Sequence, residues 1–255
     1  MAVDRSVEEK VSGRARTAVI TGGSSGIGLA CGRLLSERGY DVVLSARRPG
    51  PLEEAAGAIG GRWVAADSTD ETSFAAVVQE AGRVDLLVHC AGVMRGTFVR
   101  KETAEVFDDV IRTNLRSAFV ASSGVLPVMG PGGRMVFVSS SSSYAPQPGK
   151  AAYSASKAGL NAFAAALAGE VDRDGIAVHV VTPAPVDTPM LDDVHFPMVP
   201  LAAEDVAEAI VWLDTLPPRV VLPELRMKAV ERGPFAPELV VPPAAKARGR
   251  TGPAS

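Results

Sequence analysis

The sequence has few cysteines, few aromatic residues and no long apolar run, and each shortage argues against a class of protein. Two cysteines, Cys31 and Cys90, are too few for a disulfide framework or a zinc-binding cluster in 255 residues. No run of eighteen apolar residues occurs, and the charged opening MAVDRSVEEKVSGRAR lacks the apolar core of a signal peptide. A formal charge of −3 and 5% aromatic residues give no reason to expect nucleic acid or an anionic membrane as a partner. We therefore expect a cytoplasmic protein that binds a small molecule and no metal.

Apolar strands and amphipathic helices alternate along most of the chain. Strands are predicted at 17–20, 41–46, 62–66, 84–89, 134–138, 176–181 and 220–227. Helices are predicted from the glycine-rich turn to residue 38 and over 52–59, 71–81, 104–129, 152–170 and 204–213. Repeated strand–helix units of this length predict one Rossmann-type, doubly wound α/β domain, whose seven-stranded, mostly parallel sheet has helices on both faces. We expect this domain over 16–230, after a polar leader (1–15) and before a disordered tail (233–255).

A tyrosine and a lysine stand four residues apart at the start of one predicted helix. Tyr153 and Lys157 then lie on the same face of that helix. A phenol with an ordinary pKa of about 10 is a poor acid or base at neutral pH, and a nearby cation stabilises its phenolate. Tyr153 is therefore a candidate general acid or base whose pKa Lys157 lowers. For this pair alone, a core tyrosine beside a solvated lysine is the simpler interpretation, and only the features below favour catalysis.

A glycine-rich turn joins the first predicted strand to the first predicted helix. In that context a helix N-terminus offers free amide groups to a phosphate, and glycine lets the backbone approach the ligand. The spacing matches neither G-x-G-x-x-G nor the P-loop, and a tight turn without a ligand is the alternative. The expected cofactor contacts are Gly22, Ser24, Ser25, Gly26, Ile27 and Gly28.

The end of the second predicted strand indicates which dinucleotide is bound. An NAD site usually offers a carboxylate to the ribose there, about twenty residues after the glycines. Ser45 and Ala46 occupy this position, and Arg47 and Arg48 follow. A guanidinium in place of the carboxylate suits a 2′-phosphate, because arginine pairs with phosphate oxygens in a fork geometry. We expect NADP rather than NAD, with two solvated loop arginines as the alternative.

Residues just after later strands are further candidates, because ligands bind beyond the carboxyl ends of parallel strands. The candidates are Asp67, Ala91, Gly92, Pro183, Val186 and Thr188. We expect the first three near adenine and ribose, although Asp67 is equally well explained as a helix cap. The rigid proline-rich segment at 182–189 suits the flat nicotinamide ring.

Two further polar residues are candidates for the reaction itself. Asn114 lies inside a predicted helix, where its side chain competes for backbone hydrogen bonds, and that cost invites a functional explanation. The serine run at 139–143 begins directly at a strand end and leads into the Tyr153 helix. This order of elements favours a hydroxyl, best assigned to Ser140, near the Tyr153 phenol.

Together these features resemble the classical short-chain dehydrogenase/reductase family over about residues 16–227. TGGSSGIG at 21–28 is similar to the family's TGxxxGIG, YSASK at 153–157 to its YxxxK, HCAG at 89–92 to its NNAG, and PAPVDT at 183–188 to its PGxVxT. Ser140 lies thirteen residues before the tyrosine, as in the family. Two positions depart from the pattern. Cys90 replaces an asparagine that helps to hold the central strands, and Ala184 replaces a glycine near the nicotinamide.

The resemblance implies an NADP(H)-dependent oxidoreductase (EC 1.1.1.-) that interconverts a carbonyl and an alcohol. Tyr153 would exchange the proton, Ser140 would bind the carbonyl oxygen, and Lys157 would bind the nicotinamide ribose. Asn114 would hold a water linking Lys157 to solvent. A homodimer or homotetramer is also implied, formed through the helices around Asn114 and Tyr153. A non-catalytic NADP-binding redox sensor, and an epimerase or dehydratase on the same fold, are the alternatives.

The substrate is not identified by the sequence. Its expected walls are Val93, Met94, Arg95, Tyr144 and Gln147, with the short apolar stretch 190–201 as a cover. Within these segments only Arg95 and His195 hint at an acidic group on the substrate, and both are better explained as solvated than as ligating.

Overall fold

The structure, a computed structural model, describes residues 14–191 and 199–230. Most of the predicted leader, residues 192–198 of the predicted cover with His195, and the predicted tail lie outside the described residues.

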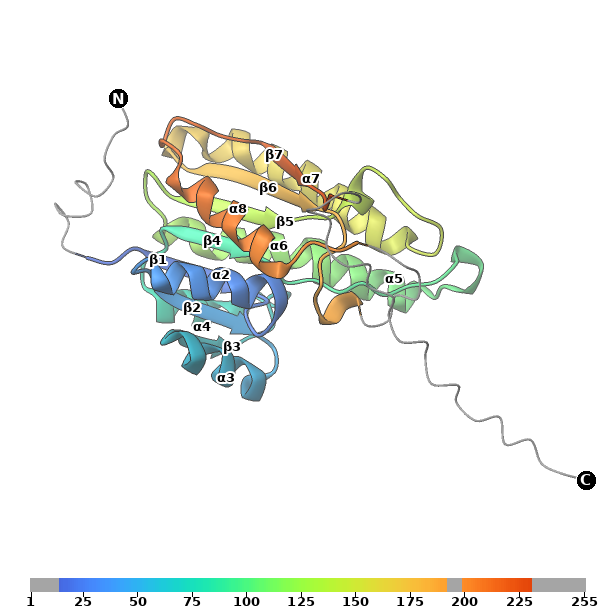
Figure 1. Cartoon of the computed structure of the whole chain (residues 1–255), viewed down its shortest axis with the longest axis horizontal. Coiled ribbons are helices and arrows are strands. Elements are labelled where there is room, and N and C mark those ends of the chain that lie inside the picture. Colours follow the sequence, from blue (N-terminus) through green and yellow to red (C-terminus); the bar gives the residue numbers. More distant parts are fainter. Residues whose placement is uncertain (1–13, 192–198, 231–255) are drawn as a thin grey trace, which may run out of the picture.

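A seven-stranded sheet forms the middle of the molecule, and every neighbouring pair of its strands is parallel (Figure 1). The strands are β1 (Thr17–Thr21), β2 (Asp41–Ala46), β3 (Arg62–Ala65), β4 (Leu86–His89), β5 (Arg134–Val138), β6 (Ala177–Pro183) and β7 (Glu224–Met227). Their order is β3-β2-β1-β4-β5-β6-β7. Strands β2 and β3 are therefore added on one side of β1 and β4 to β7 on the other, so the strand order reverses between β1 and β4. The carboxyl ends of all seven strands share one edge, which confirms the predicted doubly wound α/β fold.

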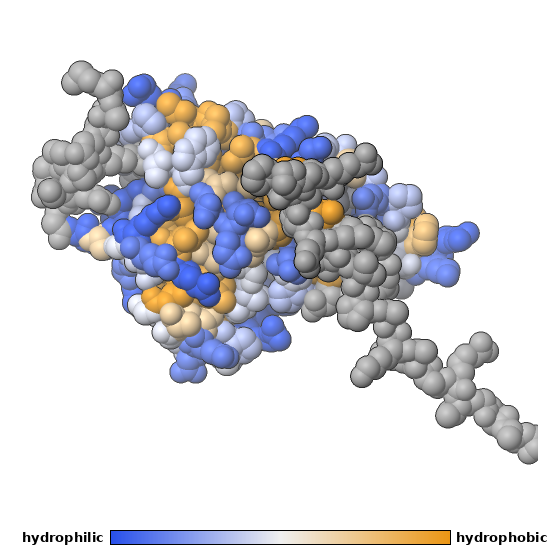
Figure 2. Space-filling view, in the orientation of Figure 1, coloured by the Kyte–Doolittle hydropathy of each residue, from blue (hydrophilic) through white to orange (hydrophobic). Residues whose placement is uncertain are grey.

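Helices cover both faces of the sheet (Figure 1). The helices are α2 (Gly26–Glu37), α3 (Pro49–Ile59), α4 (Glu71–Ala81), α5 (Ala104–Ile111), α6 (Ser117–Val125), α7 (Ala151–Val171) and α8 (Ala203–Thr215). Side chains of β1 alternate between two cores, since Ala18 and Ile20 pack with α2, α3 and α8 while Val19 packs with α4, α6 and α7. Figure 2 shows the α2–α8 side, where hydrophilic residues are interspersed with apolar ones.

Several element boundaries differ from those expected. The helix predicted over 104–129 is divided into α5, a π-helical turn (Arg112–Arg116), α6 and a 3₁₀ turn (Leu126–Val128). Part of the serine run forms a 3₁₀ turn, Ser141–Ser143. The last strand begins at Glu224 rather than at residue 220, because Val220 closes a turn onto Pro217 and Pro223 lacks the N–H that a strand needs.

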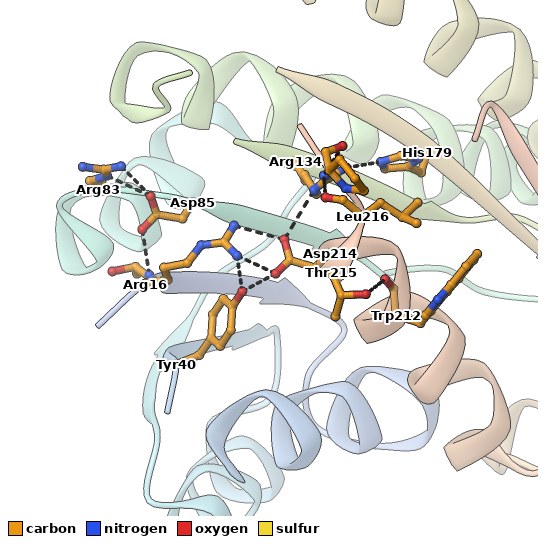
Figure 3. Close-up of polar contacts among 12 residues, drawn as sticks. Arg16, Tyr40, Arg83, Asp85, Arg134, His179, Trp212, Asp214, Thr215 and Leu216 are labelled. Carbon is orange, nitrogen blue, oxygen red and sulfur yellow. Dashed lines mark hydrogen bonds and ion pairs between the residues drawn. The ribbon is translucent and has the colours of Figure 1, made fainter. Parts of the chain in front are cut away.

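Charged side chains bind α8 to the amino ends of the strands (Figure 3). The Asp214 carboxylate accepts hydrogen bonds from Arg16 at 2.6 and 3.0 Å, and another from the Tyr40 hydroxyl. Arg134, which is 1% exposed, lies 3.7 Å from Asp214 and 3.0 Å from the His179 ring. This cluster closes the edge of the sheet opposite the carboxyl ends and holds the scaffold without taking part in the cavity described next.

Candidate functional site

A cavity of about 830 Å³ opens at the carboxyl edge of the sheet, between the loops that follow β1 to β6. Seventeen sequence-predicted site residues line it: Gly22, Ser24, Ser25, Gly26, Ile27, Gly28, Arg47, Arg48, Asp67, Ala91, Gly92, Ser140, Tyr153, Lys157, Pro183, Val186 and Thr188. Asn114 is the one predicted site residue that does not line the cavity.

All seventeen of these residues lie at this one cavity. They come from loops far apart in the sequence, which the parallel sheet brings to one edge.

The glycine-rich turn leaves room for a ligand close to the backbone. Gly22 and Gly26 have positive φ angles of 67° and 53°, which favour glycine. A Cβ added at Gly28 would lie 2.3 Å from the Gly22 carbonyl oxygen, so only glycine fits there. Helix α2 begins at Gly26, and the Ser25 side chain makes no capping hydrogen bond. Its first amide groups therefore remain available for an anion at the cavity wall.

The end of β2 presents the groups expected for a 2′-phosphate. Arg47 and Arg48 are exposed and line the cavity. The Ser45 hydroxyl is buried at the same wall and has no hydrogen-bond partner among the described residues. A buried hydroxyl without a partner is costly, and a bound ligand would satisfy it. These observations fit a phosphorylated dinucleotide.

Asp67 lines the cavity and does not cap a helix. The cap of α4 is Asp70, which accepts from the Ser73 amide at 2.6 Å, so the capping alternative for Asp67 is wrong. Asp67 instead accepts from the Thr69 amide at 2.9 Å. Partial burial raises the pKa of Asp67, but hydrogen bonds from Thr69 and the charges of Arg112 and Arg47 outweigh this and lower it. A carboxylate therefore lies in the cavity wall at Asp67.

Tyr153 and Ser140 both line the cavity. Tyr153 lies in the first turn of α7 and is 6% exposed, while Ser140 lies two residues after the end of β5. Burial raises the pKa of Tyr153 above its ordinary value, and a hydrogen bond with Ser140 offsets part of that rise. The pKa of this phenol is therefore raised overall, opposite to the lowered pKa expected from the sequence. The sequence could not reveal how deeply the phenol is buried.

Lys157 lies one helical turn after Tyr153 and points into the protein. Its ammonium donates to the Val138 carbonyl at 2.9 Å and lies 5.9 Å from the centre of the Tyr153 ring. Burial lowers the pKa of Lys157 to about 8, and the nearby Cys90 offsets part of this effect. The ammonium is thus fixed by a carbonyl rather than by a carboxylate.

Asn114 lies behind the cavity wall, within the π-helical turn, and is 0% exposed. Its carboxamide accepts from the Val93 amide at 2.7 Å and donates to the Val93 carbonyl at 2.9 Å. It also donates to the Ser156 hydroxyl at 3.0 Å. The side chain therefore joins the loop after β4 to α7, which explains its place in a helix interior.

Strand β4 ends at a buried histidine, His89. His89 is held by the Thr21 hydroxyl at 2.9 Å and the Ser117 hydroxyl at 3.0 Å. Burial lowers the pKa of His89 to about 3, and the positive charge of Lys157 adds to this effect. Neutral His89 therefore connects the glycine-rich turn to α6. Cys90 follows it and lines the cavity.

The proline-rich segment closes another side of the cavity. Val186 forms a parallel bridge with Leu201, and the Asp187 amide donates to the Leu201 carbonyl at 2.8 Å. The Ala184 amide donates to the Met227 carbonyl at 2.7 Å, so the residue that replaces glycine is held by β7. A Cβ at Gly26 would lie 3.0 Å from the Thr188 methyl group, which puts this segment against the glycine-rich turn.

Some lining residues were missed by sequence reasoning, and one predicted wall residue lies elsewhere. Arg112, Thr69 and Lys150 line the cavity, and Arg112 donates to the Thr69 hydroxyl at 3.1 Å. Their only sequence signal was position, since Thr69 follows a strand and Lys150 precedes α7. Val93, Met94, Arg95 and Gln147 line the cavity as well, but Tyr144 does not. The Tyr144 ring instead stacks under Arg226, 4.1 Å from its guanidinium carbon.

The described residues contain no helix long and apolar enough to cross a membrane. The same residues hold no group of three or more His, Cys, Asp or Glu side chains arranged for a metal ion.

A doubly wound parallel sheet with a glycine-rich turn at a helix N-terminus is typical of dinucleotide-binding folds, and here Ser140, Tyr153 and Lys157 line the same cavity as that turn. The model of the short chain dehydrogenase family matches residues 16–196, and the chain belongs to that family.

Acetoacetyl-CoA reductase of Cupriavidus necator is 37% identical over 224 residues, covering 82% of this chain and 86% of that protein. The 3-oxoacyl-[acyl-carrier-protein] reductase of Bos taurus is 33% identical, covering 78% of this chain and 90% of its own. A short chain dehydrogenase from Burkholderia cenocepacia, solved in complex with NADP, has a TM-score of 0.76 at 28% identity and covers 84% of this chain and 95% of its own.

Proposed function

We propose that this protein interconverts a carbonyl and an alcohol on a small molecule with NADP(H) as cofactor. The observation that carries the proposal is that Ser140, Tyr153 and Lys157 line the same cavity as the glycine-rich turn. The cofactor would supply the hydride. The chain would supply orientation, a proton and a partner for the charge that develops on oxygen.

Each of these residues has a distinct part in the reduction direction. Tyr153 gives its phenolic proton to the carbonyl oxygen, and its raised pKa keeps that proton in place until charge develops. Ser140 donates a hydrogen bond to the same oxygen, a contribution of about 3 kcal/mol by analogy with single oxyanion donors. Lys157 would hold the nicotinamide ribose, and Asn114 would hold a water that links Lys157 to solvent. Asn114 also fixes the Val93 segment beside them.

Tyr153→Phe tests the proton transfer. This variant removes one hydroxyl, and we expect NADPH-dependent ketone reduction to fall by a factor of about 10² or more. Tyr144→Phe is the matched control, because Tyr144 lies outside the cavity lining and its activity should stay near that of the unmodified protein. A spectrophotometric assay over ketones, aldehydes and 3-oxoacyl thioesters measures both. Activity of Tyr153→Phe equal to the control would rule the mechanism out.

The same screen separates the proposal from its rivals. Tight NADPH binding without turnover of any carbonyl would favour a redox sensor. A retained cofactor with no net oxidation would favour an epimerase or a dehydratase. The 3-oxoacyl thioesters belong in the screen because two relatives are reductases of acetoacetyl-CoA and of 3-oxoacyl-acyl carrier protein.

The preference for NADPH over NADH is proposed to come from Arg47 and Arg48. Both line the cavity beside Ser45, and β2 offers no carboxylate at this end. We expect Arg47→Ala to raise KM for NADPH about 10-fold to 100-fold while KM for NADH changes little, since a charge-assisted hydrogen bond contributes about 1.5–3 kcal/mol. Arg33→Ala, an exposed arginine of α2 that does not line the cavity, is the matched control. An unchanged cofactor preference would remove Arg47 from this role.

We further propose a cytoplasmic homodimer or homotetramer. Phe107 of α5 and Phe119 of α6 are 40% and 50% exposed, and Ala158 of α7 is also exposed. Ala164 and Leu167 of the same helix α7 are instead buried in the core of the chain itself. Light scattering that finds only monomers would contradict this proposal.

A further inference from the structure

The loop that carries Ser140 is held by one asparagine of α7. Asn161 is partly buried and lies one helical turn after Lys157. Its carboxamide accepts a hydrogen bond from the Ser139 hydroxyl at 2.5 Å and donates one to the Ser143 hydroxyl at 3.4 Å. These two serines flank Ser140 in the sequence. One side chain therefore contacts the loop on both sides of the residue that presents the reacting hydroxyl.

The direction of the Asn161 carboxamide is set by a carboxylate of β7. Its amide nitrogen also donates to one oxygen of Glu224 at 3.3 Å, and the buried Thr182 hydroxyl donates to the same oxygen at 2.9 Å. A hydrogen bond from Arg226 lowers the pKa of Glu224 although burial opposes it, so the carboxylate stays ionised at neutral pH. An ionised carboxylate only accepts hydrogen bonds, so the NH₂ group of Asn161 faces Glu224 and its oxygen faces Ser139. The Asn161 network, as it is called below, consists of Ser139, Ser143, Asn161 and Glu224.

Hydrogen bonds inside the loop connect this network to Ser140. The Ser139 amide donates to the Val181 carbonyl at 2.8 Å, which fixes the start of the loop on β6. The Ser140 hydroxyl accepts from the Ser142 amide at 3.2 Å, and the Ser140 carbonyl accepts from the Ser143 amide at 2.9 Å. The position of the Ser140 hydroxyl therefore depends on where Ser142 and Ser143 lie, and Asn161 binds Ser143 directly.

Asn161 and Glu224 lie away from the cofactor. Neither is among the described residues that line the cofactor cavity, and both instead line a second hollow of about 340 Å³ with apolar side chains of α7 and β6. Their influence on the reaction must therefore pass through the Ser140 hydroxyl, which has to lie within hydrogen-bonding distance of the carbonyl oxygen. A misplacement of about 1 Å can lower a rate by a factor of about 100.

We propose that Asn161 is a positioning residue for the reduction and that Glu224 fixes the direction of its carboxamide. This inference rests on the proposed function, because it concerns the Ser140 hydroxyl of that reaction. Asn161→Asp keeps the shape of the side chain and places a second carboxylate against Glu224, so that repulsion displaces the loop. We expect kcat for carbonyl reduction to fall about 10-fold to 100-fold. KM for NADPH should change little, because the Asn161 network does not contact the glycine-rich turn.

A second substitution should rescue this variant. When Asn161→Asp is combined with Glu224→Gln, the NH₂ group of the glutamine can face the new carboxylate, which restores a donor–acceptor pair in the reverse direction. The kcat of the double variant should return to about that of Glu224→Gln alone. A loss of stability without a change in positioning would not be reversed in this way.

A double-mutant cycle with Ser140 tests whether the effect passes through that hydroxyl. In a Ser140→Ala background, Asn161→Asp should lower kcat little further, because the hydroxyl that it misplaces is already absent. A full additional loss in that background would overturn the inference.

A measurement without turnover separates this inference from the proposed function. Hydrogen exchange of the full chain, followed by mass spectrometry, reports on the backbone amides of residues 141–145. Asn161→Asp should speed their exchange about 10-fold and leave that of residues 17–28 unchanged. Gln79→Glu is the matched control, since it makes the same amide-to-carboxylate change at an exposed position of α4 that does not line the cavity. This control should change neither the exchange nor kcat.

Unchanged exchange of the loop in Asn161→Asp would overturn the inference whether or not the chain reduces carbonyls. Faster exchange with an unchanged kcat, or a double variant as slow as Asn161→Asp, would also overturn it. A natural chain that reduces no carbonyl would overturn the proposed function, and the exchange result would then decide whether Asn161 holds the loop. Circular dichroism checks folding. If Asn161→Asp does not fold, Asn161→Ala, which removes the same hydrogen bonds without adding a charge, replaces it in the kcat and exchange measurements.

Discussion

At the scale of single residues, His89 makes the stability of the protein depend on pH. Its ring is buried and neutral, and its pKa is lowered to about 3. In the unfolded chain the pKa of His89 returns to about 6.5. Below that pH the unfolded state therefore binds a proton that the folded state does not bind until the pH is near 3. The stability that neutral His89 contributes to the free energy of unfolding is therefore fully present above about pH 6.5. It is lost as the pH falls toward 3.

His89→Asn is the variant that isolates this effect, because asparagine does not titrate. From about pH 7.5 to about pH 4.5 the unmodified protein should lose about 2–3 kcal/mol more unfolding free energy than the variant. Urea unfolding at the two pH values gives the difference, in which the titration of all other groups cancels. Equal losses in both proteins would show that His89 takes up its proton as readily in the folded state as in the unfolded one.

Residue types were predictable from the sequence where a motif fixed them, and their environments were not. The spacing of Tyr153 and Lys157 indicated a shared helix face, and both side chains line one cavity. The direction of the Tyr153 pKa shift was wrong, because it depends on burial and on Ser140, which lie outside any local pattern. Lys150 and Arg112 were missed for the same reason, since only the fold brings them to the cavity.

At the scale of elements, the close approach of α2 to the glycine-rich turn depends on the absence of a side chain at Gly28. A Cβ at Gly28 would lie 2.3 Å from the Gly22 carbonyl oxygen. This clash is with backbone atoms, so the turn itself would have to shift to relieve it. We expect Gly28→Ala to destabilise the protein by about 1–3 kcal/mol and to abolish measurable NADPH binding, because the turn must open. Urea unfolding and a fluorescence titration with NADPH measure the two effects.

Gly169→Ala is the matched control in another helix. Gly169 lies in α7, is exposed, and has nothing within 4 Å of an added Cβ. Alanine should stabilise this helix by about 0.5–1 kcal/mol and leave NADPH binding unchanged. If Gly28→Ala behaved like Gly169→Ala, the close approach of α2 to the turn would not matter for the site.

The elements were largely predictable because the alternation of apolar runs and turns is local. The boundaries that failed are those set by distant contacts. Asn114 interrupts the helix predicted over 104–129, and its carboxamide is held by Val93 and by Ser156, neither of which is near it in the sequence. The late start of β7 has a local cause in Pro223, a signal that was present and that the prediction did not use.

At the scale of the whole molecule, one carboxylate joins parts of the chain that the sequence does not connect. Asp214 at the end of α8 binds Arg16 before β1 and Tyr40 before β2, and it lies near Arg134 of β5 (Figure 3). Asp214 is 4% exposed and Arg134 is 1% exposed. Two arginines therefore share a buried counter-charge, and the pairing spans 198 residues between Arg16 and Asp214.

Asp214→Asn removes that counter-charge while keeping the shape of the side chain. We expect a loss of about 3–5 kcal/mol in unfolding free energy, because the buried Arg134 is left without its carboxylate. Arg83→Ala is the control: it breaks the pair with Asp85 on an arginine that is 54% exposed, and should cost about 1 kcal/mol or less. KM for NADPH should stay the same in both variants, because the cluster lies at the edge of the sheet opposite the cavity. If the two variants were equally stable in urea, solvent rather than Asp214 would be stabilising the positive charge of the buried Arg134.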